Sequence, residues 1–149
     1  MNLTPVQEEI VNIKDNLVVQ ASAGTGKTHT MVCKIAQEIN DNKTHKVIAA
    51  ITFTIKAAQE IKNRLAVDVS QHFIGTNNSF VIEEIIKPFM KDVYGKDFDI
   101  DMSTDYALKV ANFDEGIEKI RSNGILTTYS DNKKNFIFEL AQSIVEQSI

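Results

Sequence analysis

The chain of 149 residues has a single cysteine, Cys33, so it cannot form an internal disulfide, and a reducing compartment fits. Cys33 lies among apolar residues, which favours packing over chemistry. No apolar run approaches the roughly 20 residues of a membrane span. The first residues, Met1-Asn2-Leu3-Thr4, have neither the basic region nor the apolar stretch of a secretory signal. We therefore expect a cytoplasmic protein without membrane contacts.

The sequence also lacks an excess of basic residues. Its formal net charge is -4, from 16 Lys and Arg against 20 Asp and Glu. This balance argues against a protein that wraps nucleic acid with its whole surface, so any DNA contact must use a local patch. Hydrophobic residues make up 43% of the chain and charged residues 24%, which is typical of a globular domain. There is no internal repeat and no low-complexity linker.

The most informative segment is Ala21-Ser22-Ala23-Gly24-Thr25-Gly26-Lys27-Thr28. It follows the apolar run Leu17-Val18-Val19, which predicts a strand over 17–21, and it opens an amphipathic stretch over 27–40. This context is typical of a phosphate-binding loop, with Ala where the commonest form has Gly. Glycines let backbone N–H groups surround phosphate oxygens, and the helix dipole favours the same charge. The alternative is a glycine-rich turn without a ligand.

Hydrophobic periodicity predicts strands and helices in alternation. Thr4, Pro5 and Gln7 have the pattern of a helix start with a capping box. Further strands are expected over 47–53 and near 72–75, and helices over 55–66 and around 81–89. Nearly all-apolar strands separated by helices predict an α/β fold, a parallel sheet with helices on both faces.

The composition changes near residue 90. Two helical stretches are predicted near 105–122 and 132–148, with a break at Asn123-Gly124. We therefore expect a sheet-forming segment over 1–90 and a helical insertion over 91–149.

Three segments carry a family resemblance: Leu3-Thr4-Pro5-Val6-Gln7, the loop 21–28, and Ile51-Thr52-Phe53-Thr54-Ile55-Lys56-Ala57-Ala58. Together they resemble the N-terminal part of superfamily-1 DNA helicases of the UvrD/PcrA/Rep type. The resemblance implies that 1–90 is an incomplete RecA-like ATP-binding segment of a P-loop NTPase. Residues 73–77, 85–89, 94–95, 129–130 and 133–136 are also similar to the UvrD-like subunit of Gabija anti-phage defence systems.

The resemblance implies ATP and Mg²⁺ as cofactors. Lys27 would reach the β- and γ-phosphates and Thr28 would ligate Mg²⁺, which makes these two the catalytic residues. Gln7 would read the adenine edge, with the capping box as the alternative role of its amide. His29 follows the loop, near the nucleotide or exposed to solvent. The implied ATP contacts are Gln7, Ala21, Ser22, Ala23, Gly24, Thr25, Gly26, Lys27, Thr28 and His29.

The resemblance also implies contacts with single-stranded or partly duplex DNA. These fall on Thr52, Phe53, Thr54, Lys56, Asn78, Ser79 and Phe80. Hydroxyls and a helix start suit phosphates, and an aromatic ring suits a base. Core packing is the alternative for Phe53, and capping of the following helix is the alternative for Ser79. The chain departs from the family pattern at Ile55, where Asn is usual, and at Asn78, where His is usual.

Several parts of a complete motor are not recognisable: a Walker B strand ending in Asp-Glu, an arginine finger and a second RecA-like domain. Asp114-Glu115 is an Asp-Glu pair after apolar residues, but its approach over 108–112 has a helical pattern. We therefore expect an N-terminal segment of a longer protein, inactive in ATP hydrolysis by itself. Without a Walker B strand beside 17–21, self-association or a rearranged sheet is expected.

Three functions remain open. The first is the ATP-binding segment of a DNA helicase or translocase. The second is a nucleotide- and DNA-sensing subunit of a Gabija-type defence complex that controls a partner nuclease, with little unwinding. The third is a small P-loop kinase, which the segment 51–58 disfavours because such kinases do not use that motif.

Overall fold

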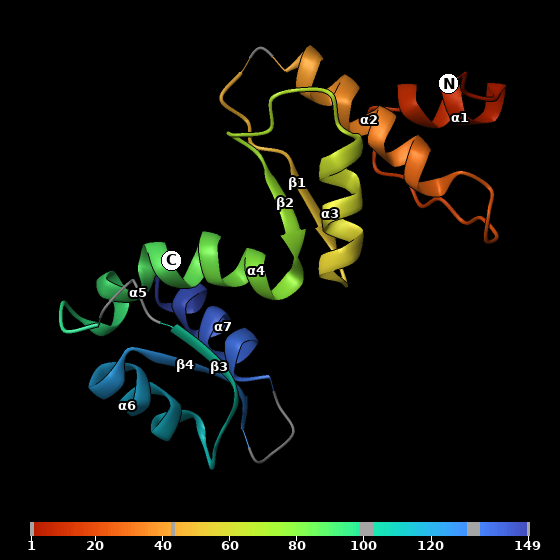
Figure 1. Cartoon of the computed structure of the whole chain (residues 1–149). Coiled ribbons are helices and arrows are strands. Elements are labelled where there is room, and N and C mark those ends of the chain that lie inside the picture. Colours follow the sequence, from red (N-terminus) through yellow and green to blue (C-terminus); the bar gives the residue numbers. More distant parts are fainter. Residues whose placement is uncertain (1, 43, 99–102, 131–134, 149) are drawn as a thin grey trace. The chain divides into compact units, whose positions relative to one another are not determined.

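The computed structural model describes residues 2–42, 44–98, 103–130 and 135–148 (Figure 1). The chain divides into two compact units, Met1–Thr76 and Asn77–Ile149. The expected boundary after residue 90 falls inside a helix of the second unit, Lys87–Tyr94. None of the described helices has the length and apolar character needed to cross a lipid bilayer.

The N-terminal unit contains a small parallel sheet packed with helices. Its elements are α1 (Pro5–Asn12), α2 (Lys27–Asp41), β1 (Ala49–Thr52), α3 (Ile55–Arg64) and β2 (Phe73–Thr76). β1 and β2 pair in parallel, from Ala49 beside Phe73 to Thr52 beside Thr76. The core consists of Val32, Ile35, Ala50, Ile61 and Ile74. The predicted mixed α/β class with parallel pairing is therefore confirmed, but the described sheet is only partial.

The start of α1 forms as its sequence predicts. The Thr4 hydroxyl accepts a hydrogen bond from the Gln7 backbone N–H (3.3 Å), and the Gln7 side-chain oxygen accepts one from the Thr4 N–H (2.9 Å). Pro5 occupies the first helical turn, where its missing N–H costs nothing. At the other end, Lys34 of α2 donates to the carbonyl oxygens of Val11 (3.2 Å) and Ile13 (2.5 Å). These contacts join α1 to α2.

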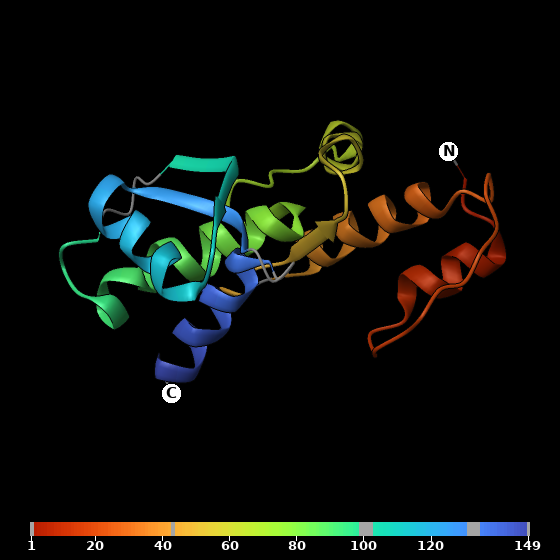
Figure 2. The ribbon, with the colours of Figure 1, turned by 90° about the horizontal axis from the view of Figure 1, so that it is seen from below.

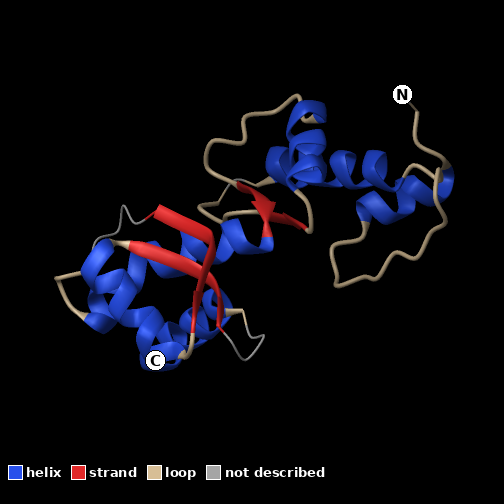
Figure 3. Cartoon of the chain, turned by 60° about the horizontal axis from the view of Figure 1, so that its bottom comes forward, coloured by secondary structure: helices blue, strands red, loops and turns tan. Residues whose placement is uncertain are grey.

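The predicted strand over 17–21 is wrong for this structure. These residues belong to the loop between α1 and α2, and Figure 3 draws that connection without a strand. The side chain of Val18 is 98% exposed and that of Val19 is 43% exposed. An apolar strand of this kind is stable when neighbouring strands satisfy its backbone and helices cover its faces. In the part of the chain that the structure describes, β1 pairs only with β2, so residues 17–21 have no strand partner.

The C-terminal unit begins with a long helical segment that changes its hydrogen-bond register. It comprises α4 (Asn77–Val81), the π-helix η1 (Ile82–Ile86) and α5 (Lys87–Tyr94). The Lys87 N–H bonds to the carbonyl of Ile82, five residues earlier. Pro88 follows directly and has no N–H for the ordinary α-helical bond, so a wider turn at this point has a local cause.

The rest of this unit is not the helical insertion that the sequence predicted. It contains β3 (Ser103–Val110), α6 (Phe113–Asn123), β4 (Ile125–Ser130) and α7 (Phe136–Ser148). β3 and β4 pair in parallel, with α6 as the crossover between them (Figure 2). The helix expected near 105–122 is thus a strand followed by a helix, whereas the helix expected near 132–148 is confirmed as α7. The expected break is also confirmed, because Gly124 ends α6 with a left-handed φ of 64°.

The second unit has the larger core. It is formed by residues from the helices and β4 and by Phe98 of the loop after α5, with Ile86, Met90, Leu126, Phe136 and Leu140 all fully buried. The Tyr94 hydroxyl lies 2.7 Å from the Ser143 hydroxyl and connects α5 to α7. Gly116 of α6 lies against the Phe136 ring so closely that a β-carbon there would be 2.2 Å from a ring carbon.

Candidate nucleotide-binding site

The loop 21–28 has the backbone conformation that its glycines predict. Gly24 and Gly26 have φ angles of 77° and 83°, a left-handed conformation that side-chain-bearing residues rarely adopt. Gly26 is the N-cap of α2, and no side chain caps the first N–H groups of that helix. A helix start that leaves its first N–H groups without side-chain acceptors is suited to bind an anion.

The side chains of Lys27 and Thr25 donate hydrogen bonds to carbonyl oxygens of the loop itself. The Lys27 ammonium donates to the carbonyl oxygens of Ala21 (2.8 Å) and Ser22 (2.6 Å). The Thr25 hydroxyl donates to the same Ser22 carbonyl (2.8 Å). The side-chain cation thus lies over the loop, next to exposed backbone. A phosphate group is a stronger acceptor than these neutral carbonyls because it is charged.

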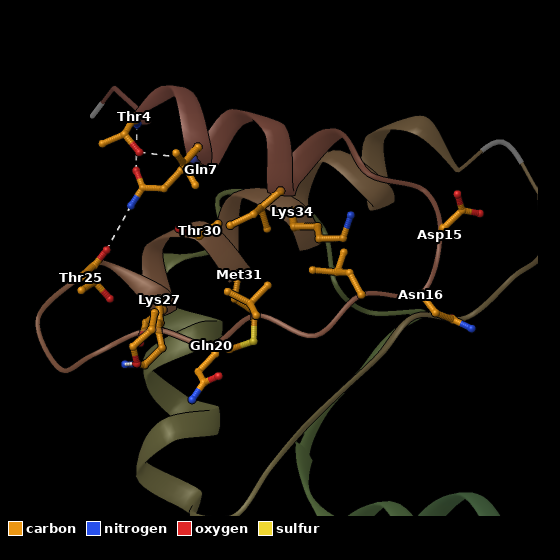
Figure 4. A pocket seen from close by; sticks show the side chains of 16 residues that line it. Thr4, Gln7, Asp15, Asn16, Gln20, Thr25, Lys27, Thr30, Met31 and Lys34 are labelled. Carbon is orange, nitrogen blue, oxygen red and sulfur yellow. Dashed lines mark hydrogen bonds between the residues drawn. The ribbon is translucent and has the colours of Figure 1, made fainter.

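Beside the loop lies a cavity of about 880 Å³. Figure 4 shows it between α1, the connecting loop and the start of α2. Its volume falls within the range of small-molecule sites, about 300–1,000 Å³. Of the predicted ATP contacts, it brings together Gln7, Ala21, Thr25, Lys27 and Thr28. Ser22, Ala23, Gly24, Gly26 and His29 are not among its lining residues.

Sequence reasoning missed other residues of the cavity wall. Among them are Asp15, Asn16, Gln20, Met31 and Lys34. They are spread over a loop and one helix face and match no motif, so only the fold brings them together. Nearby, Lys14 donates to the carboxylates of Glu38 (3.0 Å) and Asp41 (3.3 Å). The hydrogen bond to Glu38, and then that to Asp41, raise the pKa of the Lys14 amine.

His29 and Cys33 lie one turn apart on α2. The Cys33 sulfur lies 3.8 Å from the Nε2 atom of His29, and both side chains are half-buried. Within the described residues no group of three His, Cys, Asp or Glu side chains could hold a metal ion.

The residues predicted to contact DNA fall into two groups. Thr52 donates from its hydroxyl to the carbonyl of Thr54 (2.9 Å), and Thr54 caps α3 by accepting from the Ala57 N–H (3.2 Å). Phe53 is 93% exposed, so core packing does not describe its side chain in this structure. Lys56 is exposed on the first turn of α3.

The second group, Asn78, Ser79 and Phe80, belongs to α4 of the other unit. Ser79 is the third residue of that helix, so the alternative that it is the N-cap is wrong. Phe80 is partly buried against the core of the C-terminal unit.

Asp114 and Glu115 lie in the first turn of α6 and not at the end of a strand. Their surroundings are those of a helix cap: Asn112 accepts a hydrogen bond from the Glu115 N–H (3.0 Å), and the Glu115 carboxylate accepts one from the Ala111 N–H (2.7 Å). A cap explains the position of Glu115, and Asp114 lies in the first turn, where the helix dipole favours an acidic residue.

Residues 3–147 match the model of the UvrD/REP helicase N-terminal domain, and the chain belongs to this family. It is 44% identical to the Gabija protein GajB of Bacillus cereus (strain VD045) over 96% of the chain and 29% of that relative. It is 36% identical to an ATP-dependent helicase/nuclease subunit of Streptococcus mutans serotype c over 56% of the chain and 7% of the relative. A third relative is the exonuclease/helicase subunit RexA of Lactococcus lactis subsp. cremoris, at 36% identity over 48% of the chain and 6% of the relative. The chain thus spans less than a third of the length of these relatives.

Proposed function

We propose that this chain is the ATP-binding N-terminal segment of a UvrD-like, ATP-dependent DNA helicase or translocase. The observation that carries the proposal is the loop 21–28: two left-handed glycines lead into a helix whose first N–H groups have no side-chain cap. The loop adjoins a cavity of nucleotide-compatible size that also contains Gln7. Family membership supports a RecA-like arrangement in the complete protein.

Each part of the site has a role in nucleotide binding. Backbone N–H groups of the loop hold phosphate oxygens, and Lys27 exchanges its two carbonyl partners for the β- and γ-phosphates. Thr28 lines the cavity, and its hydroxyl would be one ligand for Mg²⁺. This ion often keeps several waters and takes further ligands from substrate phosphates, so one protein oxygen at the loop fits it. When bound, Mg²⁺ would neutralise charge on the phosphates.

DNA binding by the segment 52–56 is the second part of the proposal. Its support is the exposed Phe53 ring, the exposed Lys56 and the strand-end position of the segment. The distribution of charge also favours the N-terminal unit as the part of the chain that contacts DNA. Residues 1–76 contain 8 Lys and Arg against 7 Asp and Glu, whereas 77–149 contain 8 against 13. We retain Asn78, Ser79 and Phe80 as proposed contacts on the family pattern alone.

A Gabija-type defence subunit that senses nucleotide and DNA is the alternative function. The observation that favours it is the similarity to GajB, which covers 96% of the chain and so extends through the second unit. A nuclease partner would belong to this alternative. A cytoplasmic location remains the prediction drawn from the single cysteine.

We expect the purified 149-residue chain to bind Mg·ATP without measurable turnover, with or without single-stranded DNA. The expectation is supported by the position of Asp114 and Glu115 in the first turn of α6, whereas a Walker B pair ends a strand. A coupled phosphate-release assay measures this. DNA-stimulated release that disappears on Lys27→Ala would contradict the expectation.

Self-association of the chain is the other expectation of this proposal. The segment 17–21 begins with the apolar run Leu17-Val18-Val19, is exposed at Val18 and is unpaired with any described strand, and exposed apolar segments of this kind recruit strands from other chains. We expect dimers or larger species in light scattering, and Val18→Lys should shift them to monomer because a charge blocks edge pairing. Val145→Lys is the matched control, since Val145 is 43% exposed on α7. A monodisperse monomer with slow amide exchange along 17–21 would count against this idea.

A further inference from the structure

The side-chain amide of Gln7 bonds at both ends. Its oxygen accepts from the Thr4 N–H at 2.9 Å, and its nitrogen donates to the Thr25 carbonyl at 3.2 Å, across 18 residues of sequence (Figure 4). The reversed amide would place donor against donor at Thr4 and acceptor against acceptor at Thr25. The two partners therefore determine the orientation of the amide.

We infer that Gln7 is a positioning residue for the phosphate-binding loop, acting through the Thr25–Gly26 peptide and independently of any contact with a base. This inference rests on the proposed nucleotide binding. It gives Gln7 a role in phosphate binding, so the effect of Gln7 should be seen with any polyphosphate ligand.

The argument follows from the geometry of one peptide unit. The described residues include no cis peptide bond. In a trans peptide the C=O and the following N–H point in opposite directions. Because Gln7 holds the Thr25 carbonyl, the Gly26 N–H is directed away from Gln7. Gly26 is the N-cap of α2, so its N–H belongs to the helix start that would receive the phosphates.

Gly26 makes this contact possible. A β-carbon at position 26 would lie 2.9 Å from the Gln7 nitrogen, too close for the amide to keep its place. The lack of a side chain at Gly26 thus allows both the contact with Gln7 of α1 and the left-handed φ of 83°.

The experiment compares inorganic tripolyphosphate with ATP, both with Mg²⁺, by calorimetry on the full 149-residue chain. Gln7→Glu keeps an acceptor for the Thr4 N–H but has no donor for Thr25. Gln7→Met removes both bonds without adding charge. Thr4→Ala removes the hydroxyl from the capping box and leaves the Gln7 donor intact. Circular dichroism verifies that all variants are folded, and the Gly26 amide signal in nitrogen–proton NMR reports on the loop.

We expect Gln7→Glu and Gln7→Met to weaken tripolyphosphate binding by about fivefold, the effect of one neutral hydrogen bond. ATP binding should weaken by at least the same factor. The Gly26 amide signal should shift in both variants, and Thr4→Ala should change neither the signal nor the tripolyphosphate affinity.

Two results would overturn the inference while leaving nucleotide binding in place. One is a loss of ATP affinity with unchanged tripolyphosphate affinity, which would assign Gln7 to the base alone. The other is an equal loss in Thr4→Ala, which would assign the effect to the helix cap. A wild-type chain that binds neither ligand would overturn the proposed function, and this inference with it.

Discussion

Replacing Lys27 by Ala is expected to weaken Mg·ATP binding by about 30-fold, or ~2 kcal/mol, the typical value of a hydrogen bond to a charged group. Lys27 is the only side-chain cation in the loop 21–28. Its ammonium already lies within 2.8 Å of the loop carbonyls of Ala21 and Ser22, so a short movement brings it to a phosphate at the same place. Calorimetry with Mg²⁺ measures the change directly.

The same substitution should barely affect stability. Both carbonyls that Lys27 contacts belong to exposed residues, and water can replace the ammonium there. Lys62→Ala is the matched control, because Lys62 is an exposed lysine of the same unit that does not line the cavity. Equal ATP affinity in the wild type and Lys27→Ala, with Lys62→Ala also unchanged, would remove the loop from the proposed site.

The parts of the site that the sequence predicted correctly depend on local signals. Thr4 and Gln7 form a capping box within four residues, and Gly24 and Gly26 take the left-handed conformation that Gly-rich loops require. Helix periodicity after Lys27 likewise acts over a few turns and predicted α2 within one residue of its observed end.

The prediction of a strand over 17–21 was wrong because the formation of a strand depends on residues that are distant in the sequence. Its apolar residues are compatible with a buried strand, but a strand forms only where other strands offer hydrogen bonds. In the described residues the sheet of this unit consists of β1 and β2. The contact between Gln7 and Thr25 was unpredictable for a related reason: it joins residues that only the packing of α1 beside the loop brings together.

The strand β3 was missed although its sequence contains a signal. Tyr106, Leu108 and Val110 alternate with Ala107 and Lys109, a period of two that is typical of a strand. A helix was predicted over 105–122 because Phe113, Ile117 and Ile120 have a strong helical period. That prediction continued the helix N-terminally past Asn112, which is the N-cap of α6. An Asn before an acidic first turn is a helix start, and it marks the point where that interpretation should end.

Gly116→Ala is expected to destabilise the C-terminal unit by about 1–2 kcal/mol, because overpacking in a core costs about 2 kcal/mol, the middle of its range, and the helix propensity of Ala offsets part of this cost. The added β-carbon would lie 2.2, 2.5 and 2.8 Å from three carbons of the Phe136 ring. Phe136 is fully buried and packs against the Phe113 ring at 5.5 Å between centroids, so it has little room to move. The helix propensity of Ala returns up to about 1 kcal/mol, which keeps the net loss moderate.

A double-mutant cycle tests whether the ring is the cause. Phe136→Leu alone leaves a cavity and should also destabilise the unit, but in the Gly116→Ala background the smaller side chain makes room for the new methyl group. The two losses should therefore fall short of additivity by at least about 1 kcal/mol, as expected for residues in contact. Urea unfolding followed by circular dichroism gives each free energy, with Ser122→Ala as an exposed control on the same helix. Strictly additive losses would mean that the clash with Phe136 does not limit the size of residue 116, and that the glycine is required for another reason.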